Sequence, residues 1–259
     1  MGYDTFPQFA SHHLSIGGCF MVKIPKKISP CPIANATVEF RFSTDWGETQ
    51  LFGEFYSRLK DHYPQFEELP IRQIPQHILQ KDEALRYQPY YQFAAPSLMV
   101  WLGAQVVSFT NSYPYIGWEA FRPKCLDVWN ILNELGAIRE IERLGLRYVN
   151  VFEEVEIFSK TSISPTLNLD FSGFTQKTSY FRTSFRRDAF GCLLQVSNEL
   201  AELQQHRTAS LIDIDISLEK EHLHNSTLID TLDLAHTIEK ELFFGLLQPA
   251  FLNTLNPEY

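Results

Sequence analysis

The chain has 259 residues, of which 44% are hydrophobic and 20% charged, and its net charge is -9. These values describe a globular protein with a substantial core, and the acidic balance supplies no global positive field for a nucleic acid. No run approaches the roughly 18 apolar residues of a membrane helix, and four separated cysteines fit neither a paired-thiolate zinc site nor a disulfide framework. We therefore expect a reduced, cytoplasmic protein without a membrane segment or a cofactor.

Residues 1–20 show no clear period, and we expect them to be a loose N-terminal extension. From residue 21 onward the chain alternates between the periods typical of strands and helices. In the first half, residues 21–158, these periods predict a strand at 37–43, a helix at 49–63, strands at 85–94 and 98–110, a helix at 118–135 and a strand at 138–158.

The second half, residues 159–259, begins with a linker-like stretch. Its periods predict strands at 167–171, 180–187, 192–200 and 210–218, and a last helix between a capping sequence at 225–227 and Pro249. The predicted fold class is α+β. We expect antiparallel sheets in two similar halves, each a strand meander covered by a long helix, packed as one globular unit.

Several short motifs are spread over nearly the whole chain between residues 21 and 247. They are Arg143-Leu-Gly-Leu-Arg147-Tyr148-x-Asn150, Pro32-Ile33 before Val38-Glu39-Phe40-Arg41-Phe42, Tyr115-x-x-Trp118-x-x-Phe121, Leu211-Ile-Asp-Ile-Asp215 and Phe243-Phe244-x-x-Leu247. With these motifs the chain resembles a sporadically distributed prokaryotic family of conserved hypothetical proteins of about this length. After the last motif the family usually continues with Thr and an acid, whereas Gln248-Pro249 follows here. The resemblance implies no established activity, and the patchy occurrence of the family suggests mobile or defence-associated genes.

Two carboxylates alternate with isoleucines in the predicted strand at 210–218. Asp213 and Asp215 should therefore lie on one face of that strand. A pair of this kind can hold a divalent metal, with His222 or His224 supplying nitrogen ligands. The sequence leaves this metal site open as an alternative.

A structural interpretation of the same aspartates is favoured over the metal site. The predicted strand at 180–187 places Arg182 and Arg186 on one face. Cross-strand pairs between arginine and aspartate are common in sheets and contribute roughly 0.2–1 kcal/mol each. We therefore expect an ion ladder or a charged binding surface.

Glu39 and Arg147 each interrupt an otherwise apolar strand. A charge in such a setting tends to be paired, so we expect the two side chains to approach each other or to face one concavity. The pair would then be either a salt bridge that fixes the fold or part of an anion-binding site.

The sequence contains no phosphate-binding loop, dinucleotide-binding glycine motif, nucleophile elbow or zinc-protease motif. Our leading hypothesis is a non-enzymatic binding or accessory protein that holds a protein partner, or a second copy of itself, on a charged sheet face. A defence or toxin-neutralising context would suit it, because an acidic protein attracts a basic partner. Two alternatives remain open: a metal-dependent phosphoester hydrolase using Asp213 and Asp215, and a sensor that grips an anion with Arg147 and Arg182.

Overall fold

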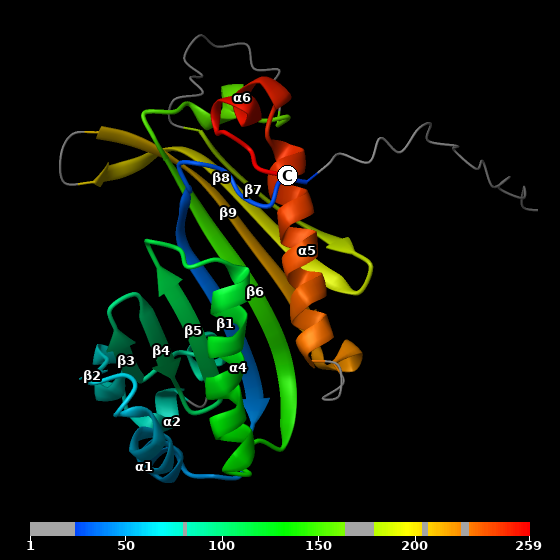
Figure 1. Ribbon diagram of the computed structural model, residues 1–259. Helices are drawn as coiled ribbons and strands as arrows, with labels where there is room; N and C mark the ends of the chain where they lie inside the picture. Colours follow the sequence, from blue (N-terminus) through cyan, green and yellow to red (C-terminus); the bar gives the residue numbers. More distant parts are fainter. Residues whose placement is uncertain (1–23, 80–81, 164–178, 204–206, 224–227) are drawn as a thin grey trace, which may run out of the picture.

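The computed structural model describes residues 24–79, 82–163, 179–203, 207–223 and 228–259, and its fold class is α+β (Figure 1). Its nine strands form one antiparallel sheet in the order β2-β3-β4-β5-β1-β6-β9-β8-β7. The strands are β1 (Ile33–Ser43), β2 (Gln65–Glu68), β3 (Tyr91–Ala95), β4 (Leu98–Leu102), β5 (Val106–Ser112), β6 (Glu140–Glu153), β7 (Tyr180–Arg187), β8 (Phe190–Leu203) and β9 (Arg207–Glu219).

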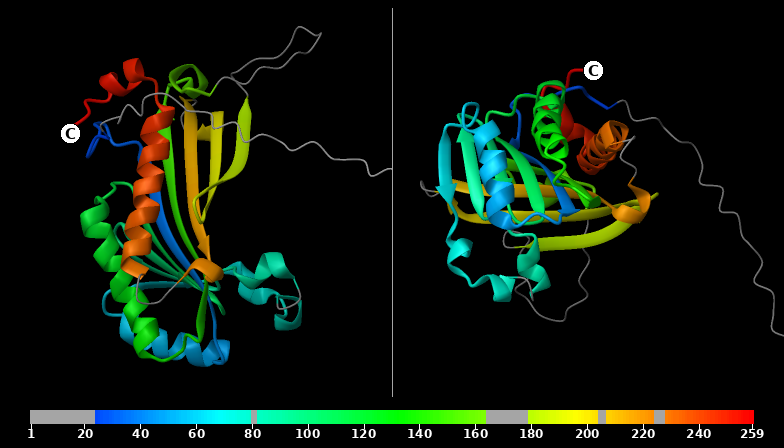
Figure 2. Two further views of the ribbon diagram at one scale, coloured as in Figure 1. Left: turned by 90° about the vertical axis from the view of Figure 1, so that its right-hand side faces the viewer. Right: turned by 90° about the horizontal axis from the view of Figure 1, so that it is seen from below.

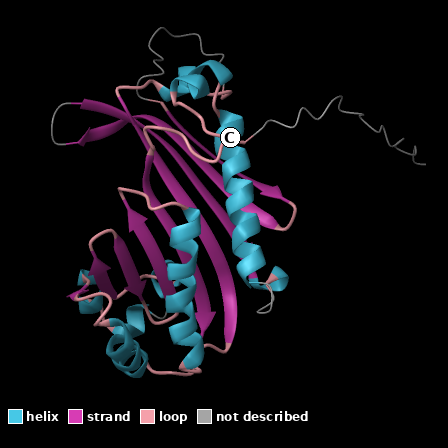
Figure 3. Cartoon of the chain, in the orientation of Figure 1, coloured by secondary structure: helices cyan, strands magenta, loops and turns pink. Residues whose placement is uncertain are grey.

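The antiparallel arrangement agrees with the sequence prediction, and the strands of both halves belong to a single sheet. The halves meet where β6 of the first half pairs with β9 of the second, while β6 pairs on its other edge with β1. Figure 3 shows these long central strands running side by side. Their register places Arg147 of β6 opposite Thr37 of β1 and Asp215 of β9.

The helices lie on both sides of this sheet. They are α1 (Glu48–Leu59), α2 (Gln76–Leu79), α3 (Glu83–Arg86), α4 (Trp118–Glu134), α5 (Leu228–Leu246) and α6 (Pro249–Thr254), with short 3-10 turns η1 (Pro70–Gln73), η2 (Ile157–Lys160) and η4 (Lys220–His222). Figure 2 shows α4 and α5 on the same side of the sheet, whereas the segment from η1 to α3 lies on the opposite side. Within the described residues, no helix is both long and apolar enough to cross a membrane.

The main core lies between the sheet and the two long helices. Alternation along β1 turns Val38, Phe40 and Phe42 to this side, where each is at most 1% exposed. Trp129 of α4 packs on Phe40 with ring centroids 4.4 Å apart, and α5 contacts β6 and β9. The opposite side of the central strands is left for polar side chains.

The sequence prediction of one strand at 98–110 is wrong, because β4 and β5 are separated by a turn at Gly103. A Cβ atom at this position would lie 2.4 Å from the backbone oxygen of Gln88, so only glycine fits. The amide of Gly103 donates to the carbonyl of Val106 and closes the turn. The predicted strand at 85–94 is also too long, since it overlaps α3 and β3 begins only at Tyr91.

Some predictions fall outside the described residues. They concern the N-terminal extension at 1–20, the strand at 167–171 and the capping sequence at 225–227. The helices predicted at 49–63 and 118–135 correspond to α1 and α4, and the last helix corresponds to α5.

Candidate functional site

A row of charged side chains crosses the side of the sheet that faces away from α4 and α5. Strand alternation and register bring these residues together from β1, β6 and β9. We call this set the charged face; it consists of Glu39, Arg41, Arg143, Arg147, Asp213 and Asp215.

Arg147 and Asp213 form a bidentate ion pair at the centre of this face. Arg147 donates from Nε to Asp213 Oδ1 over 2.8 Å and from Nη2 to Oδ2 over 2.6 Å. Gln195 of β8 donates a third hydrogen bond to Oδ2 over 2.7 Å. The hydrogen bonds to Asp213 raise the pKa of Arg147. Because the carboxylate is almost fully buried while the Arg147 side chain is 51% exposed, the pair holds the guanidinium in place at the surface.

Arg143 connects three carboxylates and is the most buried arginine of the charged face. Its guanidinium lies 3.0 Å from Glu39, 3.3 Å from Asp215 and 3.6 Å from Glu219, and the side chain is only 15% exposed. Glu39 also accepts a 2.8 Å hydrogen bond from Arg41. Burial raises the pKa of Asp215, and the nearby Arg143 opposes that shift.

Arg143 was not predicted from the sequence as a site residue; Arg147 was predicted as the partner of Glu39. Glu39 and Arg147 do share one side of the sheet, but Glu39 lies opposite Gly145, and its ion pairs are with Arg143 and Arg41. Gly145, a glycine inside the strand motif, was the sequence signal that pointed to a special position beside Arg143. In the structure, a Cβ atom there would lie 2.6 Å from Nη1 of Arg143. The missing side chain makes room for the guanidinium.

Gly145→Ala should therefore lower the free energy of unfolding by about 1–2 kcal/mol, because the added methyl displaces Arg143 from Glu39. Urea denaturation measures this loss. Gly53→Ala is the matched control: it lies in α1 with no atom within 4 Å of the new Cβ, so alanine should stabilise that helix by up to about 1 kcal/mol. Equal effects of the two substitutions would contradict a special role for Gly145.

Arg182 and Arg186 lie on β7, two strands away from the aspartates. β8 separates β7 from β9, so the acids pair with arginines of the adjacent β6 instead. Arg182 makes no hydrogen bond or ion pair within the described part of the chain, and Arg186 donates only a 3.4 Å bond to the carbonyl of Ala189. Both line a shallow depression of about 560 Å³ beside Arg143 and Asp215. The expected ladder between β7 and β9 is therefore not formed.

The alternative metal site requires free carboxylate oxygens and nearby imidazoles. Both oxygens of Asp213 already accept hydrogen bonds from Arg147 or Gln195. His222 is exposed in η4, and His224 lies outside the described residues. Among the residues that are described, no three His, Cys, Asp or Glu side chains are grouped as a metal site.

A cavity of about 740 Å³ lies on the helix side of the sheet and was not predicted from the sequence. Tyr148 and Asn150 of β6 line it, so the Arg147-Tyr148-x-Asn150 motif is divided between the two sides of the strand. The hydroxyls of Tyr148 and Tyr115 are hydrogen bonded over 2.8 Å. His236 of α5 stacks on Trp118 at a centroid distance of 4.4 Å, and burial lowers the pKa of His236 to about 4.

Glu239 of α5 also lines this cavity and is 5% exposed. Burial raises its pKa from 4.5 to about 8. A sequence signal for it existed, because position 239 falls four residues after Ala235 and seven after Leu232, on the apolar stripe of the helix. The sequence position therefore predicts that the carboxyl group of residue 239 is buried.

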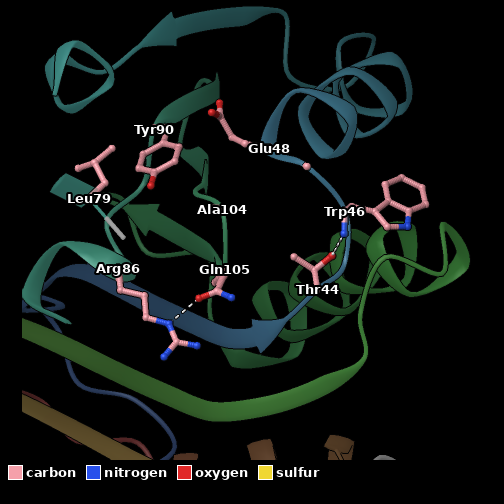
Figure 4. A pocket seen from close by; sticks show the side chains of 9 residues that line it. Thr44, Trp46, Glu48, Leu79, Arg86, Tyr90, Ala104 and Gln105 are labelled. Carbon is pink, nitrogen blue, oxygen red and sulfur yellow. Dashed lines mark hydrogen bonds between the residues drawn. The ribbon is translucent and has the colours of Figure 1, made fainter. Parts of the chain in front are cut away.

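A smaller cavity of about 380 Å³ lies near the start of α1. Figure 4 shows Arg86 reaching Gln105 through the hydrogen bond that joins them, with Tyr90 and Glu48 also lining the space. Glu48 pairs with Arg72 over 2.8 Å. Because the charged groups here have partners within the protein, this cavity offers little to a charged ligand.

Comparison with protein families and with curated proteins gives no basis for an assignment. No protein-family model matches the chain, and no curated protein matches it either. Functional inference therefore depends on the charged face and the cavity.

Proposed function

We propose that this chain is a non-enzymatic binding protein that holds a protein partner on the charged face. The observation that supports the proposal best is the fixed position of Arg143 and Arg147, each held by carboxylates on the side of the sheet that α4 and α5 leave uncovered. Charges held in this way lose little side-chain entropy when a partner binds, so they favour specific recognition.

Two arginines of the edge strand β7 would contact the partner directly. Arg182 and Arg186 are exposed and have no acidic partner within the described residues. A carboxylate of the partner could pair with them in the depression beside Arg143. The net charge of -9 would at the same time speed the approach of a partner that is basic overall.

The biological setting that we propose rests on the resemblance described above. Membership in the sporadically distributed prokaryotic family would suit a mobile-element or defence-associated gene. A basic toxin, such as a nuclease, would then be a natural partner for neutralisation, because the charge of this chain is opposite. As part of the same proposal, the two halves are structurally similar units; the position of α4 and α5 on one side of the sheet supports this (Figure 2).

Charge reversal on β7 tests the depression beside the charged face, where the partner would contact the chain. We expect the wild type to capture a reproducible protein from lysate of the native cell, and the Arg182→Glu/Arg186→Glu variant to lose it. Arg58→Glu/Arg139→Glu is the matched control, since these arginines are exposed elsewhere and form only surface ion pairs. Light scattering of the wild type identifies the case in which the partner is a second copy. Loss of capture by the control, or its retention by the test variant, would overturn the proposal.

A further inference from the structure

The 740 Å³ cavity is built from five separate parts of the chain and has the size of a small-molecule site. The segment that leads into β1, the start of α4, the strand β6, the helix α5 and Glu258 near the C-terminus all contribute to its wall. Apolar contacts come from Ile28, Ile33, Phe243 and Phe244. A few polar groups, among them the Tyr115 and Tyr148 hydroxyls, interrupt this surface.

Glu239 differs from the other buried or half-buried acids in having no partner. It forms no hydrogen bond or ion pair with any described residue, although it is 95% buried. Asp213, by contrast, is held by Arg147 and Gln195, and Glu142 accepts a hydrogen bond from Tyr87. Because burial of an unpaired charge is costly, the carboxyl of Glu239 remains protonated until a counter-charge is supplied.

The cations around the cavity do not supply that counter-charge. Lys26 donates to the backbone oxygen of Tyr259, and Lys27 pairs with Glu258 over 3.0 Å. Lys240 follows Glu239 on the helix without forming an ion pair to it. Its charge lowers the pKa of Glu239 by less than burial raises it, and burial lowers the pKa of Lys240 itself. Glu239 therefore remains as a buried acid that faces a cavity large enough for a ligand.

We propose that this cavity binds a small organic amine whose ammonium group pairs with Glu239. The ammonium would remove the cost of the unpaired carboxylate, and its remaining protons would reach the Tyr115 and Tyr148 oxygens. The apolar part of the ligand would contact Phe243 and Phe244. At a pH that ionises Glu239, an anionic ligand would meet a like charge, and a neutral ligand would leave the carboxylate without a counter-charge.

Three probes of nearly the same shape distinguish these cases: 2-phenylethylamine, 2-phenylethanol and 3-phenylpropanoate. Calorimetric titration of the full chain at about pH 8.5 keeps the amine protonated while permitting Glu239 to ionise. We expect saturable binding of the amine, at least about tenfold tighter than the alcohol or the acid, which corresponds to about 1.4 kcal/mol. Equal or stronger binding of the acid or the alcohol, or no binding of the amine, would overturn the proposal.

Two substitutions connect the binding to the carboxyl itself. Glu239→Gln preserves shape and should reduce amine affinity at least about tenfold, while Glu119→Gln, which removes an exposed acid at the cavity wall, should leave it unchanged. Unchanged affinity in Glu239→Gln, with folding verified by circular dichroism, would exclude the assigned role of Glu239.

Discussion

Replacing Arg143 with methionine should lower the free energy of unfolding by about 2–3 kcal/mol, although the apolar volume of the side chain is largely kept. The substitution leaves Asp215 and Glu39 without their shared partner in a part of the charged face where the arginine is 15% exposed. Burial already raises the pKa of Asp215, and the loss of Arg143 would raise it further. Urea denaturation near pH 7 measures the effect.

The same substitution at an exposed arginine provides the control. Arg139 pairs with Asp45 over 2.8 Å, but both side chains are about two-thirds exposed, so Arg139→Met should change stability by less than about 0.5 kcal/mol. In an Asp215→Asn background, Arg143→Met should cost less than it does alone, because the lost charge pair no longer contributes. Similar losses at Arg143 and Arg139 would show that the network contributes little.

Glu239→Gln should make the protein progressively more stable than the wild type as the pH rises. The pKa of Glu239 is about 8 in the folded chain, compared with its ordinary value of 4.5. The folded state therefore keeps a proton that the unfolded state releases above pH 4.5. The stability associated with this proton is complete below about pH 4.5 and is lost as the pH rises to about 8. The full difference is on the order of 5 kcal/mol.

Urea denaturation of both proteins between about pH 4 and 9 measures this difference. Subtracting the two curves removes the contribution of His236, whose lowered pKa gives stability that disappears as the pH falls from about 6.5 towards 4. Glu119→Gln should run parallel to the wild type, because that acid is exposed. Parallel curves for Glu239→Gln and the wild type would mean that the carboxyl finds a partner within the folded chain.

The sequence predicted much of the local structure because alternation and helical spacing report which side of an element is buried. It placed Asp213 and Asp215 on one side of a strand, and it located α4 and α5 within a few residues. The break at Gly103 was missed, and the contact that requires glycine there is with Gln88, fifteen residues earlier in the chain.

Pairing between strands was the main limit at the charged face. Arg182 was expected to pair with the aspartates across the intervening strand, but a single sequence does not tell that β6 lies on the other side of β9 and supplies nearer arginines. The choice between Arg143 and Arg147 as partner of Glu39 depended on a register that only the paired strands define. The cavity was even harder to predict from the sequence, since its wall combines segments more than 200 residues apart.

Because β6 contributes side chains to two surfaces, it tolerates some changes of sequence better than others. Arg147 projects from one side and Tyr148 from the other, so substitutions at the two positions can be accepted or rejected separately. An insertion or deletion of one residue between Gly145 and Arg147 would exchange the sides of every later side chain of the strand. It would remove the charge from one surface and the hydroxyl from the other in a single step. Changes of length in this strand should therefore be far rarer than changes of residue type.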